Sequence, residues 1–200
     1  MKTILLVGND KIAGEITKDL FCSDNLSMFV DKSANYNRVI RFLKRRVLKF
    51  SLLVKMIYCE LSREGLKPSS DIPSINTNSE FLRVIDELKP DRIILFRAGL
   101  IINKKIINSG IHIMNIHAAK IPDFGGIGSI HRAIQSGAYS QFASLHVITS
   151  RIDKGQVLDF EEYNLDPYLS YCNNEMKAYQ AGKKLLLRTI ESELLPNNKL

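Results

Sequence analysis

The chain has 200 residues, 45% of them hydrophobic and 24% charged, and its 28 Lys and Arg against 21 Asp and Glu give a net charge of +7. This composition is typical of a globular protein and excludes a disordered, collagen-like or coiled-coil chain. No apolar run reaches the roughly 18 residues of a membrane helix, and the first one ends at Asn9, too early for a signal peptide. We therefore expect a cytoplasmic protein without membrane association, whose charge favours anionic partners.

The three cysteines, Cys22, Cys59 and Cys172, are widely spaced and odd in number. Without a Cys-x-x-Cys pair they predict neither a zinc site nor a disulfide framework. We expect buried free thiols and no bound metal.

The first 90 residues predict alternating strands and helices. Residues 2–8 are an apolar run that ends at a glycine, which is typical of a buried strand, and residues 12–21 follow with apolar side chains at helical spacing. A second strand is expected over 27–30. The Pro and Ser residues of 67–74 predict turns, and a capped amphipathic helix is expected over 78–88.

Residues 38–60 predict one amphipathic helix, because apolar side chains such as Phe50, Val54 and Ile57 recur every three to four positions. Lys and Arg residues stand between them, and we expect these cations to form a solvated outer face. The alternative is a helix that binds phosphate groups or nucleic acid.

The second half continues the alternation. Further strands are predicted over 91–96, 110–117, 144–149 and 157–163, and helices over 130–136 and 173–195. Strands that alternate with helices predict a three-layer α/β/α fold around a mostly parallel, Rossmann-like sheet, in a single domain over 1–200. Two roles stay open for the C-terminal helix, which either covers the sheet or forms the seam of a homodimer.

Polar side chains that suit acyl transfer gather after two predicted strands. Asn115 and His117 stand two positions apart in a strand and therefore point to the same side, and Asp153 lies in the turn after the strand that holds His146. An amide can donate to a carbonyl oxygen that gains charge, an imidazole can move protons, and a carboxylate can orient the imidazole. The alternative is that these side chains only cap loops.

The surrounding strings resemble the folate-dependent formyltransferases. They are N-I-H-A-A-K-I-P-D-F-G-G over 115–126, A-I-Q-S-G over 133–137, S-L-H over 144–146 and D-K-G-Q-V-L over 153–158. The order and the intervals match the family signature, N-x-H-P-S-L-L-P-x-[YF]-x-G, A-I-x-x-G, T-x-H and D-x-G-x-I, and the resemblance is clear over 91–160. It implies the formyltransferase type of α/β fold and 10-formyltetrahydrofolate as the formyl donor.

The resemblance also implies a role for each matching residue. Asn115 and His117 would hold the formyl oxygen and shape the tetrahedral intermediate, and Asp153 would pair with His117 and help to move the amine proton. The donor would be bound by Arg97, Gly99, Leu100, Ile101 and Ile102 on one side and by Thr149, Arg151 and Ile152 on the other. The amine acceptor would contact Gly8, Asn9, Asp10, Gly126 and His146.

The departures from the family pattern bear on the acceptor. Ala118 and Ala119 replace the usual Pro-Ser, and Gly125 replaces a common Arg. The first turn carries Asp10, whose carboxylate opposes a phosphate at a helix N-terminus, although Lys11 can offset it. We therefore expect a small anionic acceptor, an amino-sugar nucleotide ahead of glycinamide ribonucleotide. About 40 residues remain after 160, which disfavours the extra domain of a methionyl-tRNA formyltransferase.

Other functions stay open. The same three catalytic side chains can direct water to the donor, which would make the chain a 10-formyltetrahydrofolate hydrolase. A different class is a non-catalytic module in which the basic residues of 38–55 bind nucleic acid or an acidic protein. We do not expect a nucleic-acid partner, and the sequence leaves a homodimer open.

Overall fold

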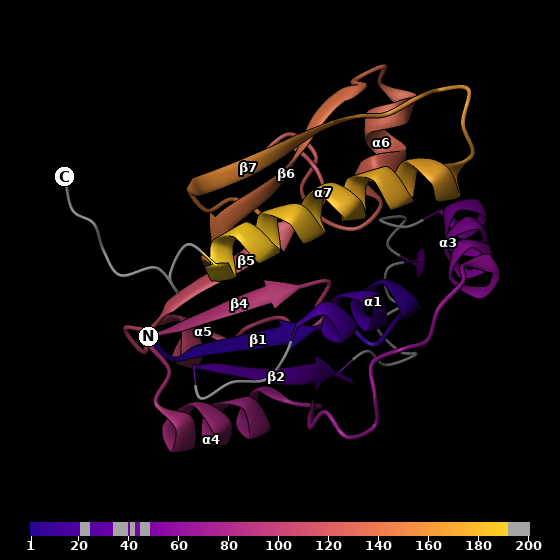
Figure 1. Cartoon of the computed structure of the whole chain (residues 1–200). Coiled ribbons are helices and arrows are strands. Elements are labelled where there is room, and N and C mark those ends of the chain that lie inside the picture. Colours follow the sequence, from indigo (N-terminus) through magenta and orange to yellow (C-terminus); the bar gives the residue numbers. More distant parts are fainter. Residues whose placement is uncertain (21–24, 34–39, 41–42, 45–48, 192–200) are drawn as a thin grey trace.

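The computed structural model describes residues 1–20, 25–33, 40, 43–44 and 49–191. Seven strands form one sheet in the order β3-β2-β1-β4-β5-β6-β7 (Figure 1). The strands are β1 (Thr3–Val7), β2 (Leu26–Asp31), β3 (Ser74–Ile75), β4 (Arg92–Phe96), β5 (His112–His117), β6 (Ser140–Val147) and β7 (Val157–Asn164). The first five are parallel, whereas β6 runs antiparallel to β5 and β7 antiparallel to β6.

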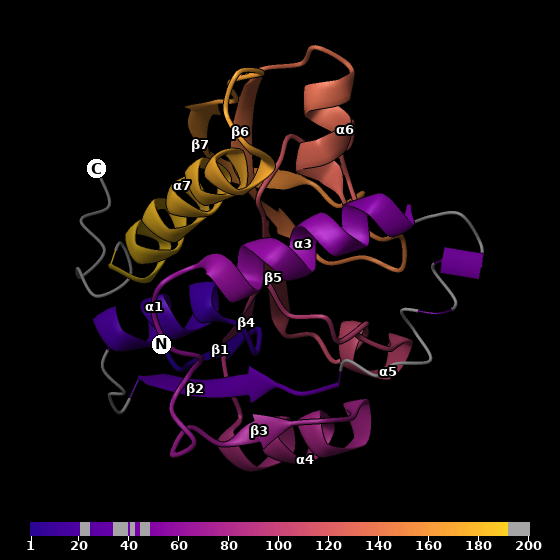
Figure 2. The same cartoon turned by 90° about the vertical axis from the view of Figure 1, so that its right-hand side faces the viewer.

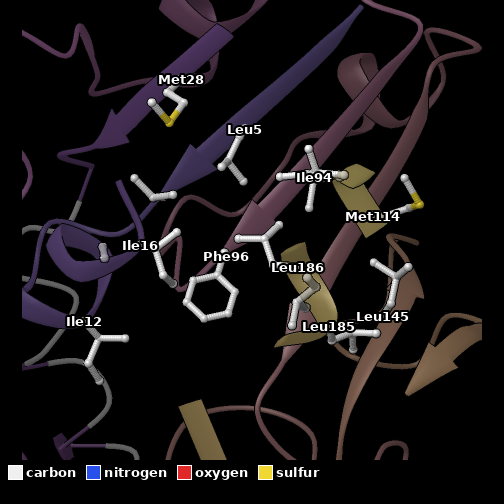
Figure 3. Close-up of a cluster of buried hydrophobic side chains, with 14 of the residues drawn as sticks. Leu5, Ile12, Ile16, Met28, Ile94, Phe96, Met114, Leu145, Leu185 and Leu186 are labelled. Carbon is white, nitrogen blue, oxygen red and sulfur yellow. The ribbon is translucent and has the colours of Figure 1, made fainter. Parts of the chain in front are cut away.

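Helices cover both faces of the sheet. They are α1 (Lys11–Asp19), α3 (Phe50–Ser62), α4 (Asn78–Leu88), α5 (Lys104–Ile107), α6 (Ser129–Gln135) and α7 (Tyr171–Glu191). Side chains of α1 and α7, such as Ile16 and Leu185, pack on one face against Leu5 and Phe96 (Figure 3). On the other face, α4 and α5 pack against the remaining side chains of the same strands. The expected three-layer α/β/α fold is confirmed.

Local sequence explains where several elements begin and end. Strands β1 and β4 are buried along their whole length, which is why they consist of near-continuous apolar runs. The Asp10 side chain caps α1 by accepting the Ala13 N–H, and Thr77 caps α4 in the same way. Helix α4 ends at Lys89, which adopts a left-handed conformation just before Pro90.

The structure adds elements that the sequence did not predict. Strand β3 lies in the segment expected to form turns, and α5 lies in a stretch for which no helix was expected. Helix α7 packs against the sheet, which confirms the first of the two roles considered for the C-terminal helix. Residues 192–195 of the expected C-terminal helix lie outside the described residues. Within the described part of the chain, no helix is long and apolar enough to span a bilayer.

The expectation of free thiols is wrong for two of the three cysteines. Cys59 of α3 and Cys172 of α7 form a disulfide across a separation of 113 residues. The pattern could not predict this bond, because the fold alone brings these two helices together. Cys22 lies outside the described residues.

The expected basic helix also needs correction. In the described part, the helix begins at Phe50, and most of 38–48 lies outside the described residues. Phe50, Val54 and Ile57, expected on the buried side, are exposed. The helix has turned its Leu52 and Cys59 face inward instead, so that the outer face of α3 is largely apolar. Lys44, Lys49 and Lys55 are exposed as expected, and the other expected cations, such as Arg45 and Arg46, lie outside the described residues.

Candidate active site

A cavity of about 630 Å³ lies at the carboxyl ends of β4 and β5. This is the edge at which an open parallel sheet places its ligands. Its walls come from segments far apart in the sequence: residues 97–102, 115–118, 126–130 and 148–153, with His146 and with side chains of α3 and α7. The three predicted catalytic residues and all eight predicted donor-binding residues lie on this cavity.

Asn115 is oriented by His146. The two residues face each other directly in the β5–β6 pair, and the Asn115 Nδ2 lies 3.1 Å from the His146 Nε2. The His146 Nδ1 lies 3.1 Å from the Val147 carbonyl oxygen and donates to it, which fixes the ring with Nε2 toward the Asn115 amide. The amide has two N–H groups, and the second is left for a ligand in the cavity. His146 is buried to 2% exposure, which makes a positioning role its clearest one.

His117 and Asp153 form the second half of the centre. The His117 Nε2 donates to the Phe124 carbonyl oxygen at 2.9 Å, and its Nδ1 lies 3.6 Å from the Asp153 Oδ2. The other carboxylate oxygen, Oδ1, lies 3.5 Å from the His146 Nε2. Asp153 also accepts the Gly126 N–H at 2.7 Å. One carboxylate therefore joins both imidazoles.

The environment sets the charges of this centre. Burial opposes ionisation of Asp153, but the hydrogen bonds and charges of His146, His117 and the Gly126 N–H outweigh it and lower its pKa to about 2. Burial lowers the pKa of His117, although Asp153 and the Phe124 carbonyl act in the opposite direction. At neutral pH the carboxylate is ionised and His117 is neutral. A neutral His117 that donates through Nε2 keeps Nδ1 free to take a proton beside a fixed negative charge.

Two glycines let the backbone approach this centre. A Cβ on Gly125 would lie 2.9 Å from the Cβ of Asp153, and a Cβ on Gly155 would lie 1.7 Å from the Val147 carbonyl oxygen. Asp153 itself has a φ of 49°, a left-handed conformation that Asp tolerates better than most residues. The turn that carries Asp153 is thus held tightly against β6 and the loop that contains Gly125.

The segments predicted to bind the donor form the mouth of the cavity. The Gly99 and Leu100 N–H groups both donate to the Asp31 carboxylate, which fixes the loop after β4. Ile101 and Ile152 line the cavity and are half-exposed or more. Across the mouth, Thr149 Oγ1 donates to the Arg151 carbonyl oxygen at 3.0 Å, which closes a compact turn.

Arg97 lines the cavity, and contacts with Asp10 and Tyr179 hold its side chain in place. Its Nε donates to the Asp10 Oδ2 at 2.6 Å, and its guanidinium carbon lies 4.0 Å from the centre of the Tyr179 ring. Its Nη1 is buried without a hydrogen-bond partner among the described residues. Arg97 also has a φ of 57°, which is rare outside glycine. The ion pair and the aromatic contact offset this strain.

The predicted acceptor residues divide into two groups. Gly126 and His146 line the cavity, whereas Gly8, Asn9 and Asp10 do not. Asp10 is engaged twice, by the α1 backbone and by Arg97. Within the described part of the chain, the first turn does not line the cavity, and its link to the cavity is the ion pair of Asp10 with Arg97.

Sequence reasoning missed the residues that α3 and α7 contribute. Leu53 and Met56 of α3, and Tyr171, Glu175 and Tyr179 of α7, line the cavity. Glu175 is only 4% exposed and accepts from the Arg63 Nη2 at 2.7 Å. The signal available in the sequence was Glu175 itself, a charged residue on the apolar side of the predicted C-terminal helix. The described residues contain no group of three or more His, Cys, Asp or Glu that could hold a metal ion.

The chain is similar in sequence to known formyltransferases. Methionyl-tRNA formyltransferase of Thermotoga neapolitana is 25% identical over 139 residues, which cover 69% of this chain and 43% of the relative. Methionyl-tRNA formyltransferase of Francisella tularensis subsp. novicida is 23% identical over 193 residues, or 94% and 58%. The chain thus spans less than two thirds of the length of these relatives.

Solved structures show the same fold. A sugar N-formyltransferase from a Shewanella species superposes with a TM-score of 0.64 at 17% identity, over 95% of this chain and 68% of that one. Phosphoribosylglycinamide formyltransferase from Anaplasma phagocytophilum gives 0.64 at 15% identity, over 95% and 85%. The formyl transferase family model matches residues 60–190, which contain the three catalytic candidates and both segments at the cavity mouth. The chain therefore belongs to the formyl transferase family.

Proposed function

We propose that this protein transfers a formyl group from 10-formyltetrahydrofolate to a primary amine of a small-molecule acceptor. The observation that carries the proposal is the convergence of Asn115, His117 and Asp153 at one end of a cavity, in the order of the family motif. Membership of the formyl transferase family supports the same reaction class.

The cavity fits the donor in size and chemistry. A volume of about 630 Å³ lies within the range of small-molecule sites. Leu100, Ile102 and Ile148 offer apolar cover for a flat ring system, and residues 98–102 and the turn of 149–153 would hold it from two sides. This would leave the guanidinium groups of Arg97 and Arg151 for the acceptor, in contrast to the donor role expected for these two residues. When bound, the donor supplies the formyl group that is transferred.

Each side chain of the centre has a distinct task. The free N–H of Asn115 is placed to donate to a carbonyl oxygen as that oxygen gains negative charge. Neutral His117 takes the proton of the attacking amine at Nδ1, where Asp153 stabilises the resulting imidazolium. The described hydrogen-bond and ion-pair contacts of these three side chains include no hydroxyl or thiol. This favours direct transfer over a covalent acyl-enzyme.

For the acceptor, we propose an amino-sugar nucleotide rather than glycinamide ribonucleotide. The N-terminus of α1 is capped by Asp10, and the same carboxylate pairs with Arg97. A phosphate at this position would meet a negative charge rather than free N–H groups. Arg151 at the cavity mouth is exposed and is available to an anionic group of the acceptor.

Calorimetric titration with 5-formyltetrahydrofolate, a stable relative of the donor, tests the donor site. We expect saturable binding that Ile101→Asp and Ile152→Asp each weaken at least tenfold, because a charge would then face an apolar ligand. Leu158→Asp is the matched control, since Leu158 is also half-exposed but lies on β7, away from the cavity. Absence of binding by the wild type, or equal losses in all three variants, would contradict the proposed site.

A further inference from the structure

The outer face of α3 is apolar, and neither the cavity nor the core explains it. Five large apolar side chains on this face are between 48% and 73% exposed: Phe50, Val54, Ile57, Tyr58 and Leu61. We call them the α3 stripe. At 100° per residue they cluster on one side of the helix, opposite the buried Leu52 and Cys59. The helix is therefore apolar on two sides, and the body of the protein covers one of them.

The described contacts that anchor α3 use no side chain of the stripe; at Leu61 only the backbone carbonyl oxygen is engaged, by the Lys11 Nζ at 3.2 Å. Cys59 is bonded to Cys172, and Arg63, directly after the helix, pairs with Glu175. Glu60 accepts the Lys11 N–H at 2.8 Å. In Figure 2, α3 runs across the face turned toward the viewer, with α7 and α1 beside it. The stripe thus lies on a helix that is fixed in place, which is a property of a preformed contact surface.

The size of the stripe suits an interface between folded proteins. From its exposed fractions, the stripe presents on the order of 600 Å² of surface, the upper end of what monomers leave open. A standard interface buries about 800 Å² on each partner. The stripe alone would therefore provide most of the area that each partner buries in such an interface.

The stripe is complementary to itself. Two identical helices that meet antiparallel about a two-fold axis near Met56 would place Phe50 opposite the partner's Leu61. The same axis would place Val54 opposite the partner's Ile57, so that apolar side chains meet along the contact. Lys55, at the edge of the stripe, has a stem long enough to keep its charge in water.

We propose that the α3 stripe is the contact surface of a homodimer, in which two copies of this chain pack α3 against α3 in antiparallel orientation about a two-fold axis. Closed two-fold dimers are the commonest assemblies of identical chains. Because Leu53 and Met56 of the same helix line the cavity, the contact would also brace one wall of each active site. The dimer does not depend on which reaction the cavity carries out.

Sedimentation equilibrium of the full chain tests the proposal. The wild type is expected at twice its mass of 22.7 kDa and to dissociate on dilution. Tyr58→Glu should shift the protein to a monomer, with dimerisation weakened tenfold or more, since a charge would enter an apolar interface. Tyr168→Glu is the matched control, because Tyr168 is 96% exposed and lies outside the stripe. It should leave the dimer unchanged.

An engineered ion pair tests the antiparallel orientation. Phe50→Lys should weaken the dimer, and adding Leu61→Glu in the same chain should restore it, because antiparallel packing would set these two positions opposite each other. A wild type that stays monomeric at every concentration, including one that binds anionic lipid vesicles through α3, would overturn the proposal. So would a dimer that Tyr58→Glu leaves intact. Circular dichroism of each variant verifies that it remains folded.

Discussion

The cavity has two walls that are built in different ways. The wall with Asn115, His117 and Asp153 consists of strand ends and the turns that follow them, and its polar contacts link residues at most 36 positions apart. The other wall consists of α3 and α7, which are held together by the bond between Cys59 and Cys172 across 113 residues. In the proposed function, the first wall would carry the groups that perform the chemistry, and the second would shape the space for the acceptor.

The comparison suggests that changes in the two walls should have different effects. Substitutions in the strand-end wall should lower the rate of the chemical step, with binding preserved. Substitutions in the helical wall should change stability or acceptor binding and leave the chemical step intact. The following experiments are ordered from the largest expected effect to the smallest.

Removal of the amide should have the largest effect. Asn115→Ala should lower kcat by about 100- to 1,000-fold, as loss of an oxyanion donor commonly does. Asp153→Asn should act in the same range, because it removes the charge that stabilises protonated His117. Asp123→Asn, at an exposed carboxylate 3.3 Å from Lys120, is the control and should keep its activity. Steady-state kinetics with a saturating acceptor measure kcat for each variant. An Asn115→Ala variant with the wild-type kcat would contradict the assignment of Asn115 to the active site.

Loss of the disulfide should mainly reduce stability. Cys172→Ser should lower the free energy of unfolding by about 2 to 4 kcal/mol, because a long loop is no longer closed in the unfolded chain. Denaturant unfolding with and without a reductant measures the change. The reductant should destabilise the wild type and leave Cys172→Ser unaffected. If reduction destabilised both proteins equally, the disulfide would not be the cause.

Arg97 links the two walls, and its replacement should affect the acceptor. Arg97→Met keeps an apolar stem but removes the guanidinium that lies over the Tyr179 ring, and it leaves the Asp10 carboxylate without its ion-pair partner. We expect KM for the amine to rise about tenfold, the equivalent of one charge-assisted hydrogen bond. Binding of 5-formyltetrahydrofolate should change little. A larger loss of folate binding than of amine binding would show instead that Arg97 binds the donor.

The pH dependence of the rate should report His117. The proton acceptor is lost when His117 is protonated, so the rate should fall as the pH drops through the lowered pKa of this residue. The inflection is therefore expected below 6.5, the ordinary value for histidine. In Asp153→Asn, NMR titration of His117 should show a still lower pKa, because the carboxylate that favours the charged form is gone. An inflection above 6.5 would contradict this assignment.

The fold and the strand-end wall could be predicted because their signals are local. The apolar runs that became β1 and β4 are continuous, and Asn115 and His117 point to one side through strand alternation alone. The antiparallel direction of β6 and β7 left no local signal, because pairing direction is not encoded in the pattern of a single strand. Strand β3 was missed because it has two residues.

The helical wall could not be predicted because its contacts are distant in sequence. The disulfide of Cys59 with Cys172 joins residues 113 positions apart, and the ion pair of Arg63 with Glu175 joins residues 112 apart. Helix α3 also buries a different side from the one that its sequence pattern predicted. Both of its faces are apolar, so periodicity could not tell which side the body of the protein would cover.

The central claim is that the strand-end wall transfers a formyl group to an amine. The most direct test incubates the protein with 10-formyltetrahydrofolate and a panel of amino-sugar nucleotides, and identifies N-formylated products by mass spectrometry. The account predicts a formylated amine with the wild type, and almost none with Asn115→Ala under the same conditions. A wild type that binds the folate but forms no N-formyl product with any amine, or an equal yield from Asn115→Ala, would contradict it.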